Sequence, residues 1–350
     1  MELTVLRCPG CGHEKLKQQK SYLTLANGIR WLWTCLNCGM CFSETKNTFL
    51  EGLRKSISVI ARVFKDRTQG MGLNASAENN EVSKNTILDW EWRFANLKAT
   101  LLVYTLIHEF LNQLIEGDEV YTKVRSNVPQ EESNGWTAIL MDRASRFIWA
   151  MKCGKKQRQL FQAVIQTLCW VIKQTHDLTL VTDGERRYGN LLFELCQEAV
   201  STGKRGRPRI TLRKGVKVRL KNKGSQSHQR GHKRPKYEAP QAEHPETPQD
   251  ITNTQIHANH MEGQNGALRR RNSAYRRRTN TYAKRTDTLQ RTLDVHWITH
   301  NFVKVHFTTG EVPAVKLGIL KEGFSWEKLF KIQRWNTEKI MINQGIAVWN

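Results

Sequence analysis

The chain has 350 residues, enough for two or three domains rather than one. It carries 55 Lys and Arg against 32 Asp and Glu, a formal net charge of +23, which favours a polyanionic partner such as nucleic acid over an uncharged one. The same charge would also fit a basic protein without a specific partner, so composition alone does not decide between the two.

The first residues, MELTVLRCPGCG, lack the basic start and apolar stretch of a secretory signal. No uncharged apolar run approaches the roughly 18 residues of a membrane span, so we expect no membrane association. We therefore expect a cytoplasmic protein, whose thiols stay reduced. Eight cysteines in that compartment indicate metal ligands or buried thiols rather than disulfides.

Two Cys-x2-Cys pairs predict a zinc ribbon over residues 1–50. Each pair makes a tight turn that aims two thiolates at one ion, and four thiolates complete a tetrahedral, structural Zn²⁺ site. The predicted ligands are Cys8, Cys11, Cys35 and Cys38. Cys41 or His13 could replace one of them, and four unrelated buried cysteines are the alternative. The remaining cysteines lie in apolar contexts and are expected in the core: Cys153, Cys169 and Cys196.

Residues 51–96 have the pattern of a helix-turn-helix. Apolar residues recur at helical spacing from Ile57 to Phe64, residues 70–72 (Gly-Met-Gly) break the helix, and a short second helix starts at 73. Ser83 is a natural N-cap for a recognition helix. The inward anchors of that helix would be Ile87, Leu88 and Trp90. The residues expected to face DNA are Lys84, Asn85 and Thr86. An ordinary helical pair is the alternative.

The pattern changes from helix to strand further on. A connecting helix is predicted from Leu97 to Leu114. The predicted elements that follow are strands at 118–124, 137–141 and 147–151, a turn at 142–146, a helix at 160–172 and a strand at 178–183. This order predicts an α/β domain with a sheet of mixed direction covered by helices.

Three acids could form a metal site if the fold brings them together. Asp118 would begin the first strand and Asp183 would end the fourth, so the two carboxylates could meet if those strands are neighbours. Glu262 would share one face of a helix with Asn265 and Arg269. Carboxylates suit Mg²⁺ or Mn²⁺, and the amide and guanidinium suit a nearby phosphate. Three scattered acids by themselves are usually surface groups.

Four segments resemble the transposases of the insertion-sequence-one family. They are DEVYTKV at 118–124, TDGERRY at 182–188, EGQNGALRRR at 262–271 and RRRTNTYAK at 276–284. The zinc ribbon and helix-turn-helix also match the usual front end of that family, so the resemblance covers nearly the whole chain.

The resemblance implies a bacterial or archaeal, nucleoid-associated DDE transposase. Its catalytic domain would be ribonuclease-H-like and would span residues 97–200 and 251–325, with 326–350 as a C-terminal tail. The implied triad for two Mg²⁺ or Mn²⁺ ions is Asp118, Asp183 and Glu262. Asn265 matches the asparagine that lies three positions after the family's glutamate. Arg269 matches the basic residue that lies seven positions after it.

A polar insert is expected at residues 201–250. Residues 201–236 hold fourteen Lys or Arg and no acid. The Arg-Gly-Arg-Pro core resembles an AT-hook that fits a narrow minor groove, with Arg205, Arg207 and Arg209 as the contacts. A solvated, partly disordered loop that adds only phosphate affinity is an equal alternative.

Taken together, the sequence predicts a transposase that binds terminal inverted repeats in double-stranded DNA, cleaves 3′ ends and joins them to target DNA. Bringing two ends together implies a homodimer or a larger assembly on DNA. The alternatives are a DNA-binding regulator derived from a transposase, and a nuclease with the same metal site that cuts without joining.

Overall fold

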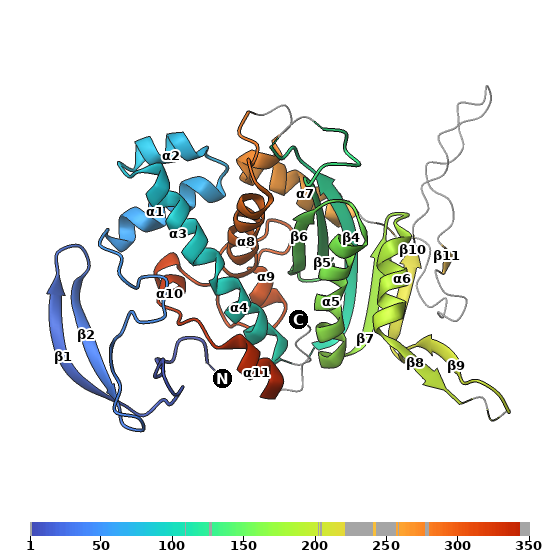
Figure 1. The fold of residues 1–350 in the computed structure, drawn as a ribbon, viewed down its shortest axis with the longest axis horizontal. Helices are drawn as coiled ribbons and strands as arrows, with labels where there is room; N and C mark the ends of the chain where they lie inside the picture. Colours follow the sequence, from blue (N-terminus) through green and yellow to red (C-terminus); the bar gives the residue numbers. More distant parts are fainter. Residues whose placement is uncertain are drawn as a thin grey trace.

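The computed structural model describes residues 2–343 except 109, 126–127, 202, 204, 221–240, 243–256, 258 and 277–279. Figure 1 shows a small N-terminal sheet, a group of helices, and a larger sheet with helices on both faces. Within the described part of the chain, no helix has the length and apolar character needed to cross a membrane.

The N-terminal sheet is a three-stranded antiparallel unit. Its strands are β1 (Leu16–Thr24), β2 (Gly28–Cys35) and β3 (Cys41–Ser43). The β1–β2 hairpin is largely exposed, and the buried core of the unit is small: Cys8, Cys35 and Phe42. A core of this size is too small to hold the unit together by itself, which is typical of domains that depend on a metal.

The helix-turn-helix pattern is confirmed as three short helices. They are α1 (Ile57–Thr68), α2 (Leu73–Asn79) and α3 (Lys84–Ala95). The predicted break lies between α1 and α2. Ser83 caps α3, because its Oγ accepts a hydrogen bond from the Thr86 amide at 3.1 Å. Ile87 and Trp90 are buried as predicted, whereas Leu88 is only half-buried.

The larger sheet has the order β11-β10-β7-β4-β5-β6. Its strands are β4 (Phe110–Tyr121), β5 (Trp136–Asp142), β6 (Ile148–Gly154), β7 (Thr175–Thr182), β10 (Val216–Leu220) and the two-residue β11 (Gln241–Ala242). β4, β5 and β6 are antiparallel neighbours, while β7 and β10 run parallel to β4. The predicted mixed sheet is therefore confirmed.

The predicted connecting helix is wrong at its C-terminal end. α4 (Leu97–Leu106) stops before residue 110, and β4 starts at Phe110 instead of at Asp118. β4 is a central strand between β5 and β7, and its residues 110–117, Phe-Leu-Asn-Gln-Leu-Ile-Glu-Gly, group apolar and polar positions in twos instead of alternating. A run of that kind also satisfies helical spacing, which explains the error.

Helices cover both faces of the sheet. α5 (Arg158–Gln174) and α6 (Arg186–Leu195) follow β6 and β7 and contact one face. α7 (Asn259–Arg271) and the short 3₁₀ helix η2 (Ser273–Tyr275) lie along β4 on the other. α8 (Thr286–Phe302) packs between β6 and α3 and so joins the sheet to the helix-turn-helix.

The predicted insert is wrong for residues 209–220. β8 (Gln197–Val200) and β9 (Arg209–Leu212) form an exposed hairpin, and β10 is part of the main sheet with Val218 fully buried. Alternating Val-Lys-Val-Arg-Leu at 216–220 is a strand pattern that the density of basic residues hides. The rest of the predicted insert, apart from β11, lies mostly outside the described residues.

The C-terminal segment is not a tail. α9 (Pro313–Lys316), α10 (Trp326–Phe330) and α11 (Thr337–Asn343) fold back onto the helical region, where α10 lies beside α1 (Figure 1). Phe330 is fully buried, with ring centroids 4.7 Å from Phe49 and 5.5 Å from Phe64. The Gln333 side chain forms two hydrogen bonds with the backbone of Arg7. It accepts from the Arg7 amide at 2.8 Å and donates to the Arg7 carbonyl at 3.1 Å. The segment thus ties the first sheet to the helices.

We expect Phe330→Ala to destabilise the protein by about 3–5 kcal/mol, because it leaves a cavity inside an aromatic cluster. Phe307→Ala is the control, since Phe307 is fully exposed, and should change stability by less than about 0.5 kcal/mol. Denaturant unfolding of both variants measures the difference. Equal stability of the two variants would contradict the packing of α10 described above.

Candidate functional site

The four predicted zinc ligands meet at one point in the first sheet. The Sγ atoms of Cys8, Cys11, Cys35 and Cys38 all lie within 4.8 Å of one another. The Cys8–Cys38 and Cys11–Cys35 pairs are each 3.5 Å apart, close to the roughly 3.8 Å between sulfurs in a tetrahedral site with 2.3 Å Zn–S bonds. The cluster could therefore bind zinc. Neither Cys41 nor His13 belongs to it.

Two tight turns aim these thiols at one point. Gly12 and Gly39 take positive φ angles of 78° and 72°, and their amides donate to the carbonyls of Cys8 and Cys35 at 2.8 and 2.9 Å. Hydrogen bonding from the His13 backbone and the Asn37 amide lowers the pKa of Cys11 to about 6. At Cys11 this favours the thiolate that a metal requires. The pKa of Cys38 is raised to about 12, since hydrogen bonding with the Met40 backbone lowers it less than the thiols of Cys8 and Cys11 raise it.

Asp118 and Asp183 lie at the same edge of the large sheet. Gly117 of β4 stands opposite Thr182 of β7 in the parallel register, and the two aspartates are the next residues along. Neighbouring strands are about 4.8 Å apart, so the backbones of the two aspartates lie close together. β4 and β7 are therefore neighbours, the condition under which the two carboxylates could meet. Asp118 lies near the end of β4, not at its start.

The backbone around Asp118 is held closely from the other face. A Cβ on Gly117 would come within 3.1 Å of the side chains of Leu140 and Thr182, so only glycine fits there without displacement. The hydroxyl of the fully buried Tyr188 donates to the Asp118 carbonyl at 3.2 Å. Burial raises the pKa of Tyr188 well above its ordinary value, so the phenol remains a donor.

α7 is confirmed as a helix and carries the remaining predicted residues. The Asn265 amide donates to Asp118 Oδ2 at 2.8 Å. Glu262, one turn earlier on the same face, is exposed, and Arg269 is half-buried. Among the described residues, the carboxylates of Asp118, Asp183 and Glu262 do not all lie within 4.8 Å of one another. The structure brings Asn265 to Asp118, and places Glu262 on the adjoining turn.

A second contact between α7 and β4 was not predicted. Glu116, two residues before Asp118, is fully buried, and its Oε1 accepts from Arg143 Nε and lies 2.7 Å from His260 Nδ1. Arg143 also donates to the His257 carbonyl at 2.7 Å. The ligand atoms of Glu116, His257 and His260 are close enough for a metal. The Arg143 guanidinium already balances the Glu116 carboxylate, so we interpret the cluster as a structural tether.

The two contacts place α7 parallel to β4. His260 lies over Glu116 and Asn265 over Asp118. The five-residue step from His260 to Asn265 rises about 7.5 Å along the helix, and the two-residue step from Glu116 to Asp118 rises about 6.6 Å along the strand. Because the two rises nearly match, both contacts can form at once. Further along, the Thr122 hydroxyl donates to the Ala274 carbonyl in η2. Glu116 and Asp118 are two positions apart on one strand, so the period-two alternation of a strand is the sequence signal that points to Glu116.

The predicted DNA-contacting residues are accessible. Lys84 and Asn85 are exposed at the N-terminus of α3, and Thr86 is half-buried, with its hydroxyl 2.8 Å from that of Ser83. Arg205 and Arg207 are exposed in the loop between β8 and β9, and Arg209 begins β9. The AT-hook-like segment is therefore at the tip of a hairpin instead of in an extended strand.

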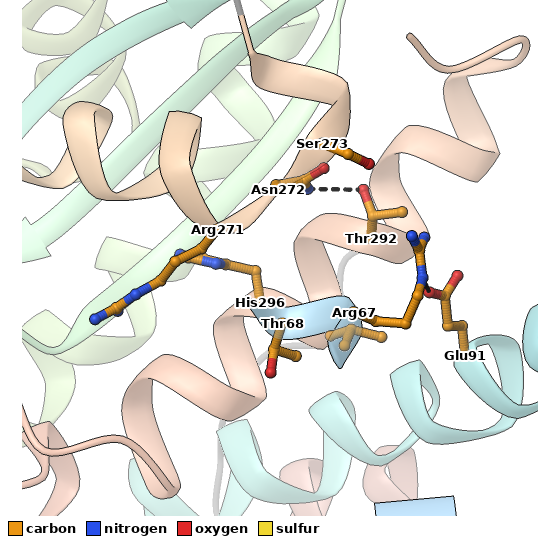
Figure 2. Close-up of a pocket in the computed structure, with 9 residues that line it drawn as sticks. Arg67, Thr68, Glu91, Arg271, Asn272, Ser273, Thr292 and His296 are labelled. Carbon is orange, nitrogen blue, oxygen red and sulfur yellow. Dashed lines mark hydrogen bonds and ion pairs between the residues drawn. The ribbon is translucent and has the colours of Figure 1, made fainter. Parts of the chain in front are cut away.

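A small cavity lies where the helix-turn-helix meets α7 and α8 (Figure 2). Arg67 is bound to Glu91 at 2.7 Å on one side of it, and Asn272 donates to Thr292 at 3.1 Å on another. Its volume of about 20 Å³ leaves room for roughly one water molecule, far less than a small-molecule site needs. The cavity is part of a tight polar contact between the two regions.

No protein-family model matches the chain, and a search of curated proteins finds no match either.

We expect Cys35→Ser to abolish zinc binding, because it removes one of four convergent thiolates. Cys41→Ser is the matched control and should keep one zinc per chain, since Cys41 lies outside the cluster. Elemental analysis of the freshly purified proteins measures both. Zinc loss in Cys41→Ser, or none bound by the unmodified protein, would disprove the assignment.

We expect Glu116→Gln to loosen α7, because it leaves the Arg143 guanidinium without a counter-charge at a cost of about 3 kcal/mol. Hydrogen exchange should rise in residues 259–271 more than in α5. Glu119→Gln is the control on the same strand, since Glu119 pairs with Lys156 at 2.8 Å. Similar exchange in α7 for the two variants would show that Glu116 does not hold this helix.

Proposed function

We propose that the protein is a DNA transposase that cleaves and joins DNA by metal-dependent phosphoryl transfer at Asp118, Asp183 and Glu262. The observation that carries this proposal is the edge formed by β4, β7 and α7. Two aspartates follow opposed residues of neighbouring parallel strands, and Asn265, one turn from Glu262, is hydrogen-bonded to Asp118 at 2.8 Å. Three acids far apart in sequence are thus carried by elements that touch.

The topology supports the proposal. Three antiparallel strands are followed by two strands parallel to the first, with a helix after the third and another after the fourth. This agrees with the ribonuclease-H-like catalytic fold that the resemblance to insertion-sequence-one transposases implies. In a sheet of this kind, ligands bind at the carboxyl ends of the parallel strands, where both aspartates lie.

The donor set suits divalent cations such as Mg²⁺ or Mn²⁺, because carboxylate oxygens are their preferred protein ligands. Asp118, Asp183 and Glu262 would hold them. Two bound ions would supply an activated water or 3′-hydroxyl and stabilisation of the leaving oxygen. Asn265 orients the Asp118 carboxylate. Arg269, on the same face of α7, would neutralise charge on the phosphate.

The N-terminal half supports recognition of double-stranded DNA. A capped helix with Lys84 and Asn85 exposed at its N-terminus has the geometry of a recognition helix that enters the major groove. The ribbon cysteines would hold a structural zinc beside it. We further propose that two copies act together, since transposition pairs two ends of one element.

We expect Asp118→Asn, Asp183→Asn and Glu262→Gln each to lower Mg²⁺-dependent DNA cleavage at least 100-fold, because each loses a charged ligand but keeps its shape. Duplex binding should remain within about threefold of the parent, because the recognition helix is untouched. The measurements are a cleavage assay in Mg²⁺ and a binding assay in Ca²⁺.

Asp177→Asn is the matched control, because Asp177 lies at the opposite end of β7 and pairs with Lys217 at 3.1 Å. It should cleave like the parent protein. Parental cleavage by any of the three site variants would remove that residue from the proposed triad. Cleavage without joining to a second DNA would indicate the nuclease alternative.

A further inference from the structure

A pair of lysines shares one aromatic ring close to the carboxyl end of β4. The Lys123 ammonium lies 4.9 Å from the centroid of the Tyr282 ring, and the Lys284 ammonium lies 4.0 Å from it. Lys284 is exposed, while Lys123 and Tyr282 are half-buried. Each cation–π contact orients an otherwise flexible ammonium. The ring therefore holds two positive charges in one small region.

No acid of the described residues offsets these charges through an ion pair. The nearest acids along the chain are engaged elsewhere: Glu119 pairs with Lys156 at 2.8 Å, and Asp287 pairs with Arg285 at 2.6 Å. Two like charges held together without a counter-ion repel each other. The arrangement would be relieved by an anion that both ammoniums can reach.

The backbone fixes this pair in place. Val124 and Ala283 form a parallel β-bridge, and the Arg125 amide donates to the Ala283 carbonyl at 2.9 Å. Lys123 precedes one side of the bridge, and Tyr282 and Lys284 flank the other. Ala283 itself is buried. The two lysines therefore come from segments that the fold joins rigidly, and are not two unrelated surface side chains.

We propose that Lys123, Tyr282 and Lys284 form a binding site for a backbone phosphodiester of DNA next to the catalytic edge. The proposal rests on the proposed function, since it takes the anion to be a phosphate of the DNA substrate. Lys123 is five residues beyond Asp118, at most about 17 Å along an extended chain. DNA rises 3.4 Å per base step, so the bound phosphate lies within roughly five nucleotides of the cleaved bond.

The chemistry fits a phosphodiester better than a base. A lysine ammonium is a compact positive charge that donates hydrogen bonds to phosphate oxygens. The Tyr282 ring is occupied by the two cations, so it positions them and is not available as a stacking platform. Such a contact carries no sequence information, and serves to set the register of the duplex on the catalytic domain.

The test is the salt dependence of binding to a short DNA duplex by the full-length protein in Ca²⁺. The Lys123→Gln/Lys284→Gln variant should lower the slope of log affinity against log salt by about 1, the loss of one phosphate contact. The control is Lys316→Gln/Lys331→Gln, which removes the same charge from two exposed lysines paired with Glu311 and Glu327. Its slope should stay at the parental value.

The ring is tested separately. Tyr282→Phe keeps the aromatic face and should bind like the parent, whereas Tyr282→Ala should weaken binding about two- to fivefold. An unchanged slope in the Lys123/Lys284 variant, or an equal drop in the control, would overturn the phosphate site. Parental affinity of Tyr282→Ala would overturn the role of the ring.

These outcomes are separable from those of the proposed function. A protein that binds duplex with the predicted change in slope but never cleaves it in Mg²⁺ would refute the transposase and keep the phosphate site. A protein that cleaves through the three acids but shows no change in slope would do the reverse.

Discussion

The docking of α7 along β4 is the constraint on which the candidate site depends. Three points hold it: Glu116 with His260, Asp118 with Asn265, and Thr122 with the backbone of η2. Glu262 is exposed and takes its position from the helix. The neighbours that hold the helix have their charges and hydrogen bonds satisfied.

Close contacts also connect the N-terminal helices α1 to α3 to the rest of the fold. Gly70, with a φ of 87°, lets the turn after α1 approach α7 so closely that a Cβ would meet the Arg270 carbonyl at 2.4 Å. Glu91 is buried between Arg67 at 2.7 Å and Arg291 at 3.4 Å, and links α1 and α3 to α8. These contacts fix α3 relative to the sheet that carries Asp118 and Asp183.

The C-terminal residues complete this connection. Phe330 and Trp326 fill the aromatic core around Phe49, Phe64 and Phe94, and Gln333 binds the ribbon backbone. The hydrophobic core runs without a break from Phe49 to the strands, while the first sheet has a small core of its own. Composition indicates where solvent exposure changes along the chain, but it does not show which segments share one hydrophobic core.

The sequence determined what depends on local spacing. The cysteine pairs, the break at Gly70 and the cap at Ser83 are fixed by residues a few positions apart, so pattern alone located them. The helix around Glu262 was a conditional expectation that the structure confirms. The sequence also located β7, because an apolar β-branched run before a carboxylate is distinctive, but it predicted Asp118 at the start of a strand instead of near the end of β4.

Tertiary structure decided what depends on partners far along the chain. β4 lies between β5 and β7 although its residues 110–117 do not alternate between apolar and polar, and β10 enters the sheet beside β7 although basic residues surround its alternating pattern. The tether of Glu116 to His260 joins residues 144 positions apart, and Lys123 reaches Tyr282 only through a bridge formed by the fold. Such pairings follow from the order of strands in the sheet, which local spacing cannot specify because it depends on long-range hydrogen bonding and burial.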